Sequence, residues 1–240
     1  MPTAILIDGA FFVKRFRALE PGNAHDAERA ADCAFRWALA HLVERGRGRG
    51  KRFRELFRIY FYDCPPLMKR LQNPISGKGI NFSTSSEALF RIQLHERLKT
   101  KRKMALRLGH LASDSVWTIK PEAIQALLKR KIRSDDLTEG DVVPHLRQKG
   151  VDMNIGVDIV TLALRKQVDQ IVLVSGDSDF VPAAKLARRE GVDFILDPMW
   201  QPVSANLQEH IDGLRSTARR RERRDGEDAR RPESVLEEAA

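Results

Sequence analysis

Short apolar runs alternate along the chain with longer segments whose apolar residues recur every three or four positions. The runs at residues 4–7, 56–62 and 171–174 are rich in β-branched or aromatic residues, which favour strands. The segments at residues 27–43 and 180–190 have the spacing of amphipathic helices. Because alternating strands and helices are typical of a parallel sheet covered on both faces, we predict an α/β fold.

The middle of the chain, residues 67–120, fits this alternation least well, and we interpret it as an insertion near the functional site. Within it we predict a loop at residues 73–79, a helix at residues 87–99, and a pair of strands at residues 104–111 and 116–119. For the rest of the chain we predict two short helices at residues 122–131 and 141–148, the last sheet strand at residues 193–196, and a closing helix at residues 203–214.

One domain is predicted for residues 1–215, followed by a tail at residues 216–240. With 240 residues and 42% hydrophobic content, the chain can bury one sizeable core. Beyond residue 216, charged residues and glycine dominate, and such a composition cannot bury a core. We therefore expect the tail to be charged and disordered.

The composition argues against membrane proteins and disulfide-rich proteins. No stretch approaches the ~20 apolar residues of a membrane span, and no basic-then-apolar signal peptide is evident. Cys33 and Cys64 are too few for a disulfide framework, and the six histidines show no metal-ligand spacing. We expect a cytoplasmic protein without structural zinc.

Carboxylates follow two of the predicted strands. Asp8 ends the run at residues 4–7, and Asp177 and Asp179 follow the run at residues 171–174 after Gly176. The carboxyl ends of strands are where open α/β sheets bind ligands. Helix capping is the alternative role for Asp179, because a predicted helix begins there.

A third acidic segment carries Asp152 and Asp158, which follow Gly150 on a predicted helix. Six residues correspond to roughly 240° around a helix, so these two carboxylates do not share a face. Carboxylates gathered in one crevice repel each other unless a cation is present. Oxygen-rich sites suit Mg²⁺ or Mn²⁺, and such ions serve reactions at phosphate esters.

Basic residues are concentrated in three clusters, at residues 45–54, 97–103 and 129–133, and the net charge of the chain is +9. Clustered cations attract polyanions by displacing counterions from phosphates. A solvated surface is the alternative interpretation of each cluster alone. The three clusters together, beside a site suited to phosphate chemistry, favour nucleic acid as the partner.

Three motifs, in this order along the chain, resemble the NYN domain, a PIN-like nuclease fold, in its bacterial LabA-like branch. The motifs are Ile7-Asp8-Gly9, Lys149-Gly150-Val151-Asp152 with Asp158, and Ser175-Gly176-Asp177-Ser178-Asp179-Phe180. The resemblance spans residues 3–215 and implies a three-layer α/β/α sandwich with a mostly parallel, Rossmann-like sheet. It also implies that divalent metal and the catalytic machinery lie at Asp8, Asp158, Asp177 and Asp179, with Asp152 a fifth metal ligand.

One position departs from the family pattern: Phe11 stands where many members have Asn. An amide that could orient water or a metal ligand is therefore missing. The aromatic ring could instead stack on a base, or it could belong to the core.

From these observations we predict a metal-dependent ribonuclease that binds Mg²⁺ or Mn²⁺ and hydrolyses RNA phosphodiester bonds. The predicted RNA-binding residues are Arg47, Arg49, Lys51, Arg52, Lys101, Arg102, Lys103 and Lys149. Two alternatives remain open: an inactive RNA-binding or protein-interaction module of the same fold, and a small-molecule phosphatase. The sequence also leaves open a homo-oligomer.

Overall fold

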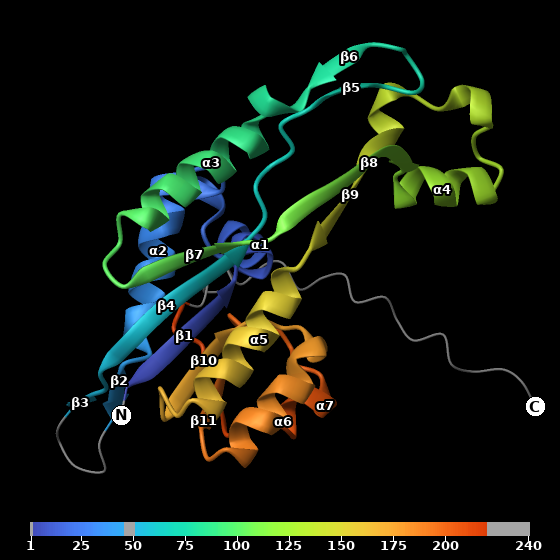
Figure 1. Ribbon diagram of the computed structural model, residues 1–240. Coiled ribbons are helices and arrows are strands. Elements are labelled where there is room, and N and C mark those ends of the chain that lie inside the picture. The colour runs from blue at the N-terminus through green and yellow to red at the C-terminus, as the bar shows by residue number, and fades with distance from the viewer. Residues whose placement is uncertain (1, 46–50, 220–240) are drawn as a thin grey trace, which may run out of the picture.

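Six parallel strands form the central sheet of the computed structural model, which describes residues 2–45 and 51–219 (Figure 1). The strand order across the sheet is β12-β11-β10-β1-β4-β7. The bounds are β1 (Thr3–Asp8), β4 (Leu56–Asp63), β7 (Met104–Leu108), β10 (Gln170–Val174), β11 (Asp193–Asp197) and β12 (Gly213–Leu214). Because all pairings are parallel, the carboxyl ends of these strands lie along one edge, here called the carboxyl edge, and their beginnings lie along the amino edge.

Helices cover both faces of this sheet, which confirms the predicted α/β/α layers. One face packs against α5 (Val151–Leu164) and α6 (Val181–Arg189). The other packs against α1 (Gly9–Leu19), α2 (Ala27–Ala40) and α3 (Ser86–Lys99). The central strands β1 and β10 are buried almost throughout, since both of their faces meet helices.

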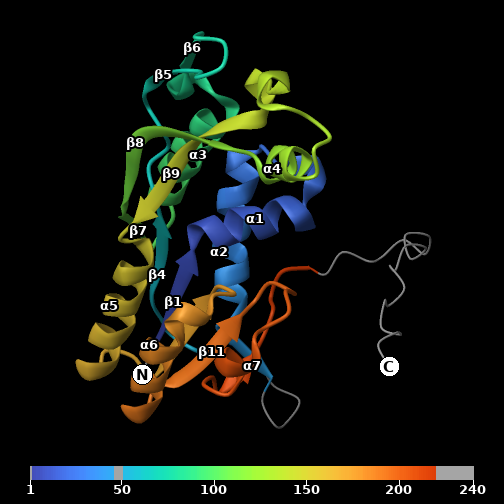
Figure 2. The same cartoon turned by 90° about the vertical axis from the view of Figure 1, so that its right-hand side faces the viewer.

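Several elements project beyond the carboxyl edge and are here called the arm (Figure 2). The arm consists of the hairpin β5 (Arg70–Gln72) and β6 (Gly79–Asn81), the antiparallel ribbon β8 (His110–Ile119) and β9 (Val142–Lys149), and α4 (Pro121–Leu128). The remaining elements are β2 (Val43–Arg45), β3 (Lys51–Phe53), α7 (Ala205–Gln208) and the 3-10 helices η1 (Pro21–Asn23), η2 (Phe82–Thr84), η3 (Ser134–Asp136), η4 (Glu139–Asp141) and η5 (Ser178–Phe180).

Two predictions for the middle of the chain were wrong. The segments at residues 104–111 and 116–119 do not pair with each other, because β7 joins the central sheet beside β4 and β8 pairs with β9. The helix predicted at residues 141–148 is not formed, because residues 142–149 form the strand β9. Its long-range pairing with β8 decides the conformation, which local pattern alone does not reveal.

The end of the fold also differs from the prediction. The closing helix predicted at residues 203–214 is only the four-residue α7, and the sheet continues past β11 with β12. Residues 216–219 lie against the body, where Ala218 is buried and accepts a hydrogen bond from Trp200 Nε1 at 2.8 Å. The predicted tail beyond them, residues 220–240, lies outside the described residues. Among the described residues, no helix has the length and apolar content to cross a membrane.

A buried ion pair fixes the carboxyl end of β4 to α3. The Asp63 carboxylate is fully buried, and both of its oxygens lie 2.6 Å from Arg91 Nη1, while His95 Nε2 lies 2.9 Å from Oδ2. Burial alone would raise the pKa of Asp63, but the His95 hydrogen bond and the Arg91 charge outweigh it and hold the pKa below its usual value. Asp63 is therefore part of the scaffold.

Replacing Arg91 with Met is expected to lower the free energy of unfolding by about 3 kcal/mol, because a buried charge loses its main partner. Urea denaturation at neutral pH measures this change. Lys99→Met is the matched control on the same helix, since Lys99 pairs with Glu96 on the exposed surface and such pairs contribute little. Equal losses in both variants would contradict the role given to the Asp63 pair.

Candidate functional site

Four carboxylates from three separate segments lie at the carboxyl edge of the sheet. Asp8 is the last residue of β1, and Asp177 and Asp179 follow β10 in and beside the turn η5. Asp152 lies in the first turn of α5, which begins at the same edge. We call Asp8, Asp152, Asp177 and Asp179 the acidic cluster. Its members are separated by up to 171 positions in the sequence, so only the parallel topology brings them together.

Asp8 is the partly buried floor of the acidic cluster. Its Oδ1 accepts a hydrogen bond from the Phe11 backbone N–H at 3.1 Å, so the side chain also caps α1. Burial raises the pKa of Asp8 to about 6, against the effect of the Phe11 hydrogen bond, and the charge of Asp152 adds to the rise. The fold therefore holds this carboxylate at a cost in free energy.

Gly9 lets the chain turn from β1 into α1 directly beside β4. A Cβ atom at Gly9 would lie 2.5 Å from the backbone oxygen of Tyr62 and 3.0 Å from Cβ of Asp63. Backbone atoms cannot move away as a flexible side chain can, so a larger residue here would displace Asp8. Glycine at position 9 is thus required by the close approach of α1 and β4.

Ser175 connects Asp8 to the loop after β10. Its buried hydroxyl donates to Asp8 Oδ2 at 3.2 Å and accepts from the Asp177 backbone N–H at 3.3 Å. The sequence motif contained Ser175, but sequence reasoning gave it no role. The structure identifies it as the residue that sets the position of Asp8 relative to Asp177.

The half-buried Phe11 ring covers Gly176 in the same loop. A Cβ atom at Gly176 would lie 2.9 Å from Phe11 Cε2, so the ring fills the space above this glycine. Phe11 also packs against the core on the α1 side of the sheet. Where the family pattern has an amide, this protein therefore has an apolar contact that supports the β10 loop.

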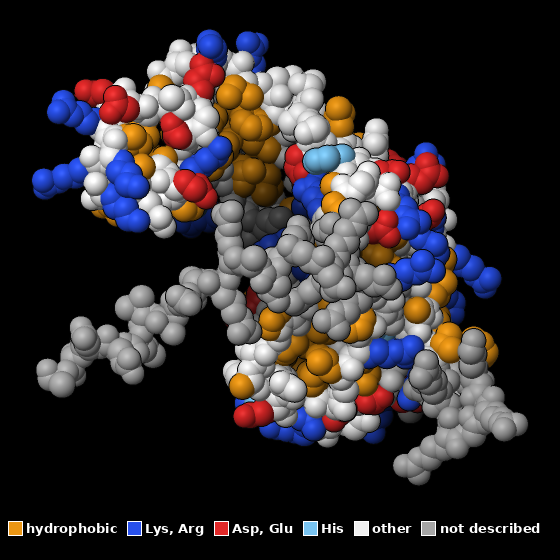
Figure 3. All heavy atoms as spheres, turned by 180° about the vertical axis from the view of Figure 1, so that it is seen from behind, with side chains coloured by type: hydrophobic (Ala, Val, Ile, Leu, Met, Phe, Trp, Pro, Cys, Tyr) orange, Lys and Arg blue, Asp and Glu red, His pale blue; other side chains and the backbone are white. Residues whose placement is uncertain are grey.

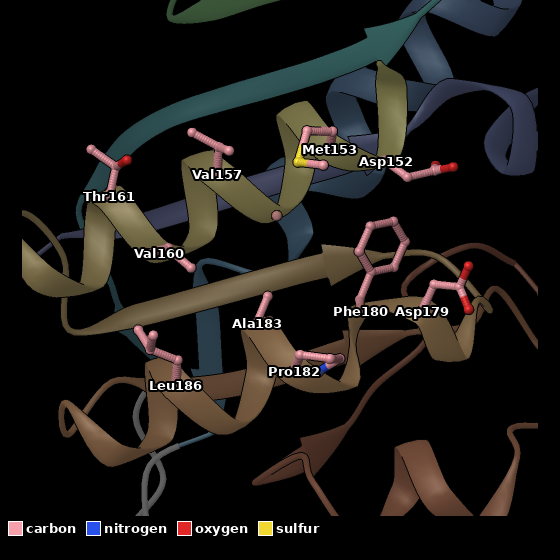
Figure 4. Close-up of a pocket in the computed structure, with 11 residues that line it drawn as sticks. Asp152, Met153, Val157, Val160, Thr161, Asp179, Phe180, Pro182, Ala183 and Leu186 are labelled. Atoms are coloured by element: carbon pink, nitrogen blue, oxygen red, sulfur yellow. The ribbon is translucent and has the colours of Figure 1, made fainter. Parts of the chain in front are cut away.

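Asp177 and Asp179 both have exposed side chains, and they differ in their local role. Asp177 caps η5, because its Oδ1 accepts from the Asp179 backbone N–H at 3.0 Å. Helix capping, the alternative considered for Asp179, therefore belongs to Asp177. The side chain of Asp179 lies at the mouth of a groove between α5 and α6, with Asp152 at the same end (Figure 4).

The exposed side chain of Asp152 is coupled electrostatically to the other members of the cluster. Desolvation by the surrounding protein raises the pKa of Asp152, and the charges of Asp177 and Asp179 raise it further. None of the ion pairs formed by the described residues includes a member of the acidic cluster. The mutual repulsion of these four carboxylates is therefore not offset by any ion pair within the described part of the chain.

Asp158, which the resemblance placed in the metal-binding set, lies elsewhere. Its Oδ2 accepts a hydrogen bond from Tyr62 Oη at 2.7 Å and lies 3.4 Å from Arg107 Nε. The reason is helix geometry: six residues after Asp152 correspond to about 9 Å along α5 and a turn of roughly 240°. Asp152 thus joins Asp8, Asp177 and Asp179, whereas Asp158 faces β4 and β7.

Most of the basic residues predicted to hold RNA are not near the acidic cluster. Lys101, Arg102 and Lys103 precede β7 at the amino edge, where Lys101 pairs with Asp32 and Lys103 donates to the backbone oxygen of Leu56. Lys51 and Arg52 belong to β3, which lies beside the beginning of β1, and Arg47 and Arg49 lie outside the described residues. A six-residue strand is about 20 Å long, so the amino edge is far from the carboxylates.

Lys149 is the predicted RNA-binding residue that lies at the carboxyl edge. It ends β9, is exposed, and precedes Gly150 and the first turn of α5. On the face seen from behind the view of Figure 1, Lys and Arg are spread over both the arm and the body (Figure 3). Lys149 therefore supplies an exposed cation near Asp152, whereas Lys51, Arg52, Lys101, Arg102 and Lys103 lie toward the amino edge.

The acidic cluster fits a divalent cation in its chemistry, although its side chains are not converged. Carboxylate and hydroxyl oxygens are the ligands that Mg²⁺ and Mn²⁺ prefer. Among residues 2–45 and 51–219, no three Asp, Glu, His or Cys side chains come close enough to form a metal-binding group. Mg²⁺ commonly uses one or two carboxylates and keeps several waters, so a compact cage is not required. In this site, Ser175 links the Asp8 carboxylate to the backbone N–H of Asp177, and the Asp177 carboxylate caps η5.

Asp8→Asn is expected to stabilise the fold above pH about 6, by about 3 kcal/mol at most, since the pKa of Asp8 is raised from 3.8 to about 6. A carboxyl with a raised folded-state pKa favours folding at low pH and loses that contribution as the pH rises through about 6. The gain should therefore vanish below pH about 4. Urea denaturation as a function of pH measures it.

The matched control for this prediction is Asp26→Asn, because Asp26 caps α2 in the same way but is exposed. Its substitution should produce no comparable gain with pH. A pH-independent effect of Asp8→Asn would contradict the stated cost of burying Asp8.

Residues 94–212 match the family model of the NYN domain. The matched segment contains Asp152, Asp177 and Asp179, while Asp8 on β1 lies before it. No curated protein matches the chain. Among solved structures, a protein of unknown function from Vibrio parahaemolyticus is similar over 90% of this chain and 91% of that chain, with 17% sequence identity and a TM-score of 0.44. By this match, residues 94–212 are similar to the NYN domain family, and that family includes nucleases.

Proposed function

We propose that this protein is a metal-dependent ribonuclease whose site is the acidic cluster. One observation carries the proposal: four carboxylates from three segments lie together at the carboxyl edge with no ion-pair partner among the described residues. A nuclease-like function agrees with the NYN domain match, and NYN nuclease domains generally act on RNA. The divalent metal and the RNA substrate are the parts that this proposal adds.

Each carboxylate has a distinct part in the proposed site. Asp8 is the fixed ligand, because Phe11 N–H and Ser175 Oγ hold its two oxygens. Asp177 is positioned by the same Ser175, and Asp152 and Asp179 complete the cluster from its exposed side. When bound, Mg²⁺ or Mn²⁺ supplies polarisation of the phosphate and hydroxide from a coordinated water.

Phosphate binding in this proposal falls to groups on the carboxyl edge. Lys149 lies just before α5 and is exposed, so it can contact the RNA backbone close to Asp152. Arg130 and Lys131 are exposed just beyond α4, on the arm that projects past the same edge (Figure 2). The backbone of a single strand would then run between the arm and the cluster.

Asp177→Asn is expected to lower the rate of RNA cleavage by at least about 100-fold, more than loss of an outer-shell partner usually does. The assay uses labelled single-stranded RNA with Mn²⁺, Mg²⁺ or EDTA. RNA binding in EDTA should be kept or strengthened, because a repelling charge is removed. Asp152→Asn should behave alike, whereas Asp158→Asn should keep activity, since Asp158 contacts Tyr62 and Arg107 instead.

The same assay separates the alternatives. RNA that stays intact in every lane, but is bound in EDTA, would replace the nuclease with a binding module. Hydrolysis of p-nitrophenyl phosphate with RNA left intact would indicate a phosphatase. Loss of cleavage in Asp158→Asn but not in Asp152→Asn would contradict the cluster as the structure assembles it.

A further inference from the structure

A groove of about 540 Å³ runs between α5 and α6 from the acidic cluster toward the opposite ends of the helices (Figure 4). Asp152 and Asp179 line its mouth, and the rest of its lining is mostly apolar. From α6 the apolar lining comes from Pro182, Ala183 and Leu186. The groove is therefore a surface that the described part of the chain leaves uncovered.

The α5 side of the groove belongs to a regular apolar stripe. The stripe consists of Met153, Val157, Val160 and Leu164, whose spacing of four, three and four residues is that of a helix seam which packs against another helix. Met153 is 70% exposed, Val157 53% and Leu164 55%. The core side of the same helix is formed by Val151, Ile155, Ile159 and Leu162, so the stripe is a second, outward-facing apolar surface.

Gly156 gives this stripe room for a close neighbour. A Cβ atom at Gly156 would meet no atom within 4 Å, so no contact within the described structure requires a glycine there. Glycine in the middle of a helix costs about 1 kcal/mol relative to alanine. A helix backbone that approaches α5 closely at this point would explain the residue.

The two ends of α5 carry opposite charges. Asp152 lies in the first turn, with Asp179 beside it at the groove mouth, and Arg165 and Lys166 follow the last turn with exposed side chains. An antiparallel copy of α5 would place Arg165 and Lys166 of one chain next to Asp152 and Asp179 of the other. A parallel copy would bring like charges together at both ends.

We propose that a second copy of this chain docks on the α5–α6 groove, with the two α5 helices antiparallel around a two-fold axis. The axis passes between Val157 and Val160, so that Val157 faces Val160 of the other copy and Met153 faces Leu164. The same contact places Arg165 and Lys166 of each copy beside the uncompensated carboxylates of the other. This inference goes beyond the proposed ribonuclease function and does not depend on it.

Val157→Glu is expected to convert a dimer into a monomer, as measured by sedimentation equilibrium. The fold of the single chain should stay intact, with an unchanged unfolding temperature of the monomer, because Val157 is exposed in the single chain. Leu128→Glu on α4 is the matched control. Leu128 is 78% exposed but lies on the arm, so its substitution should leave the dimer intact. A wild-type protein that stays monomeric at all concentrations would overturn the proposal.

Cysteine pairs test the antiparallel arrangement. Mild oxidation of a mixture of Met153→Cys and Leu164→Cys should give a cross-linked product that contains one chain of each variant. Either variant alone should give little, because identical positions are offset by about 16 Å along the helix, beyond the ~7 Å between Cα atoms that a disulfide spans. Cys33 and Cys64 are buried and should not react.

Two further outcomes would contradict the proposal. Cross-links as strong in the single variants as in the mixture would indicate a parallel or non-specific contact. A monomeric wild type whose RNA affinity falls in Val157→Glu, but not in Leu128→Glu, would assign the groove to RNA instead. Because the readouts are mass and cross-linking, they do not change if the protein fails to cleave RNA.

Discussion

Burial of the Asp8 carboxylate at the end of the central strand is the constraint on which the site depends. β1 is flanked by β10 and β4, so its last residue lies inside the sheet edge and not on the open surface. The protein keeps the charge there with two hydrogen bonds, from Phe11 and Ser175, which fix its oxygens. The same arrangement determines where Asp177 lies, because Ser175 also accepts from its backbone.

The surroundings of Asp8 differ on its two sides: buried ion pairs hold the β4 side, whereas the α5 side is exposed to solvent. On the β4 side, Asp63 is neutralised by Arg91 and His95, which ties α3 to the carboxyl edge. On the α5 side, Asp152 and Asp179 remain exposed and unpaired within the described chain. A polyanion, a cation or a basic segment can therefore approach the cluster from the α5 side. This asymmetry links the proposed chemistry to the proposed contact between two copies.

Hydrophobic pattern predicted the parts of the fold that local sequence determines. The buried runs of β1, β4 and β10 and the amphipathic helix α2 were found from the sequence, and strand ends identified Asp8, Asp177 and Asp179 as neighbours. β9 and the two-residue β12 were missed, because each is a strand only through its pairing with a distant segment. The sequence did not show which of Asp152 and Asp158 joins the acidic cluster, because that depends on which elements pack on each side of α5. It also did not show where the basic clusters lie, because that depends on which edge of the sheet each loop reaches.

The central claim is that the acidic cluster binds a divalent cation through Asp8 and Asp177. Electron paramagnetic resonance of Mn²⁺ titrated into the protein tests it most directly, because it detects binding without any substrate. We expect bound Mn²⁺ in the wild type and in Asp158→Asn, and only free Mn²⁺ in the double variant Asp8→Asn/Asp177→Asn. Binding that persists in the double variant, or that is lost in Asp158→Asn, would contradict this account of the site.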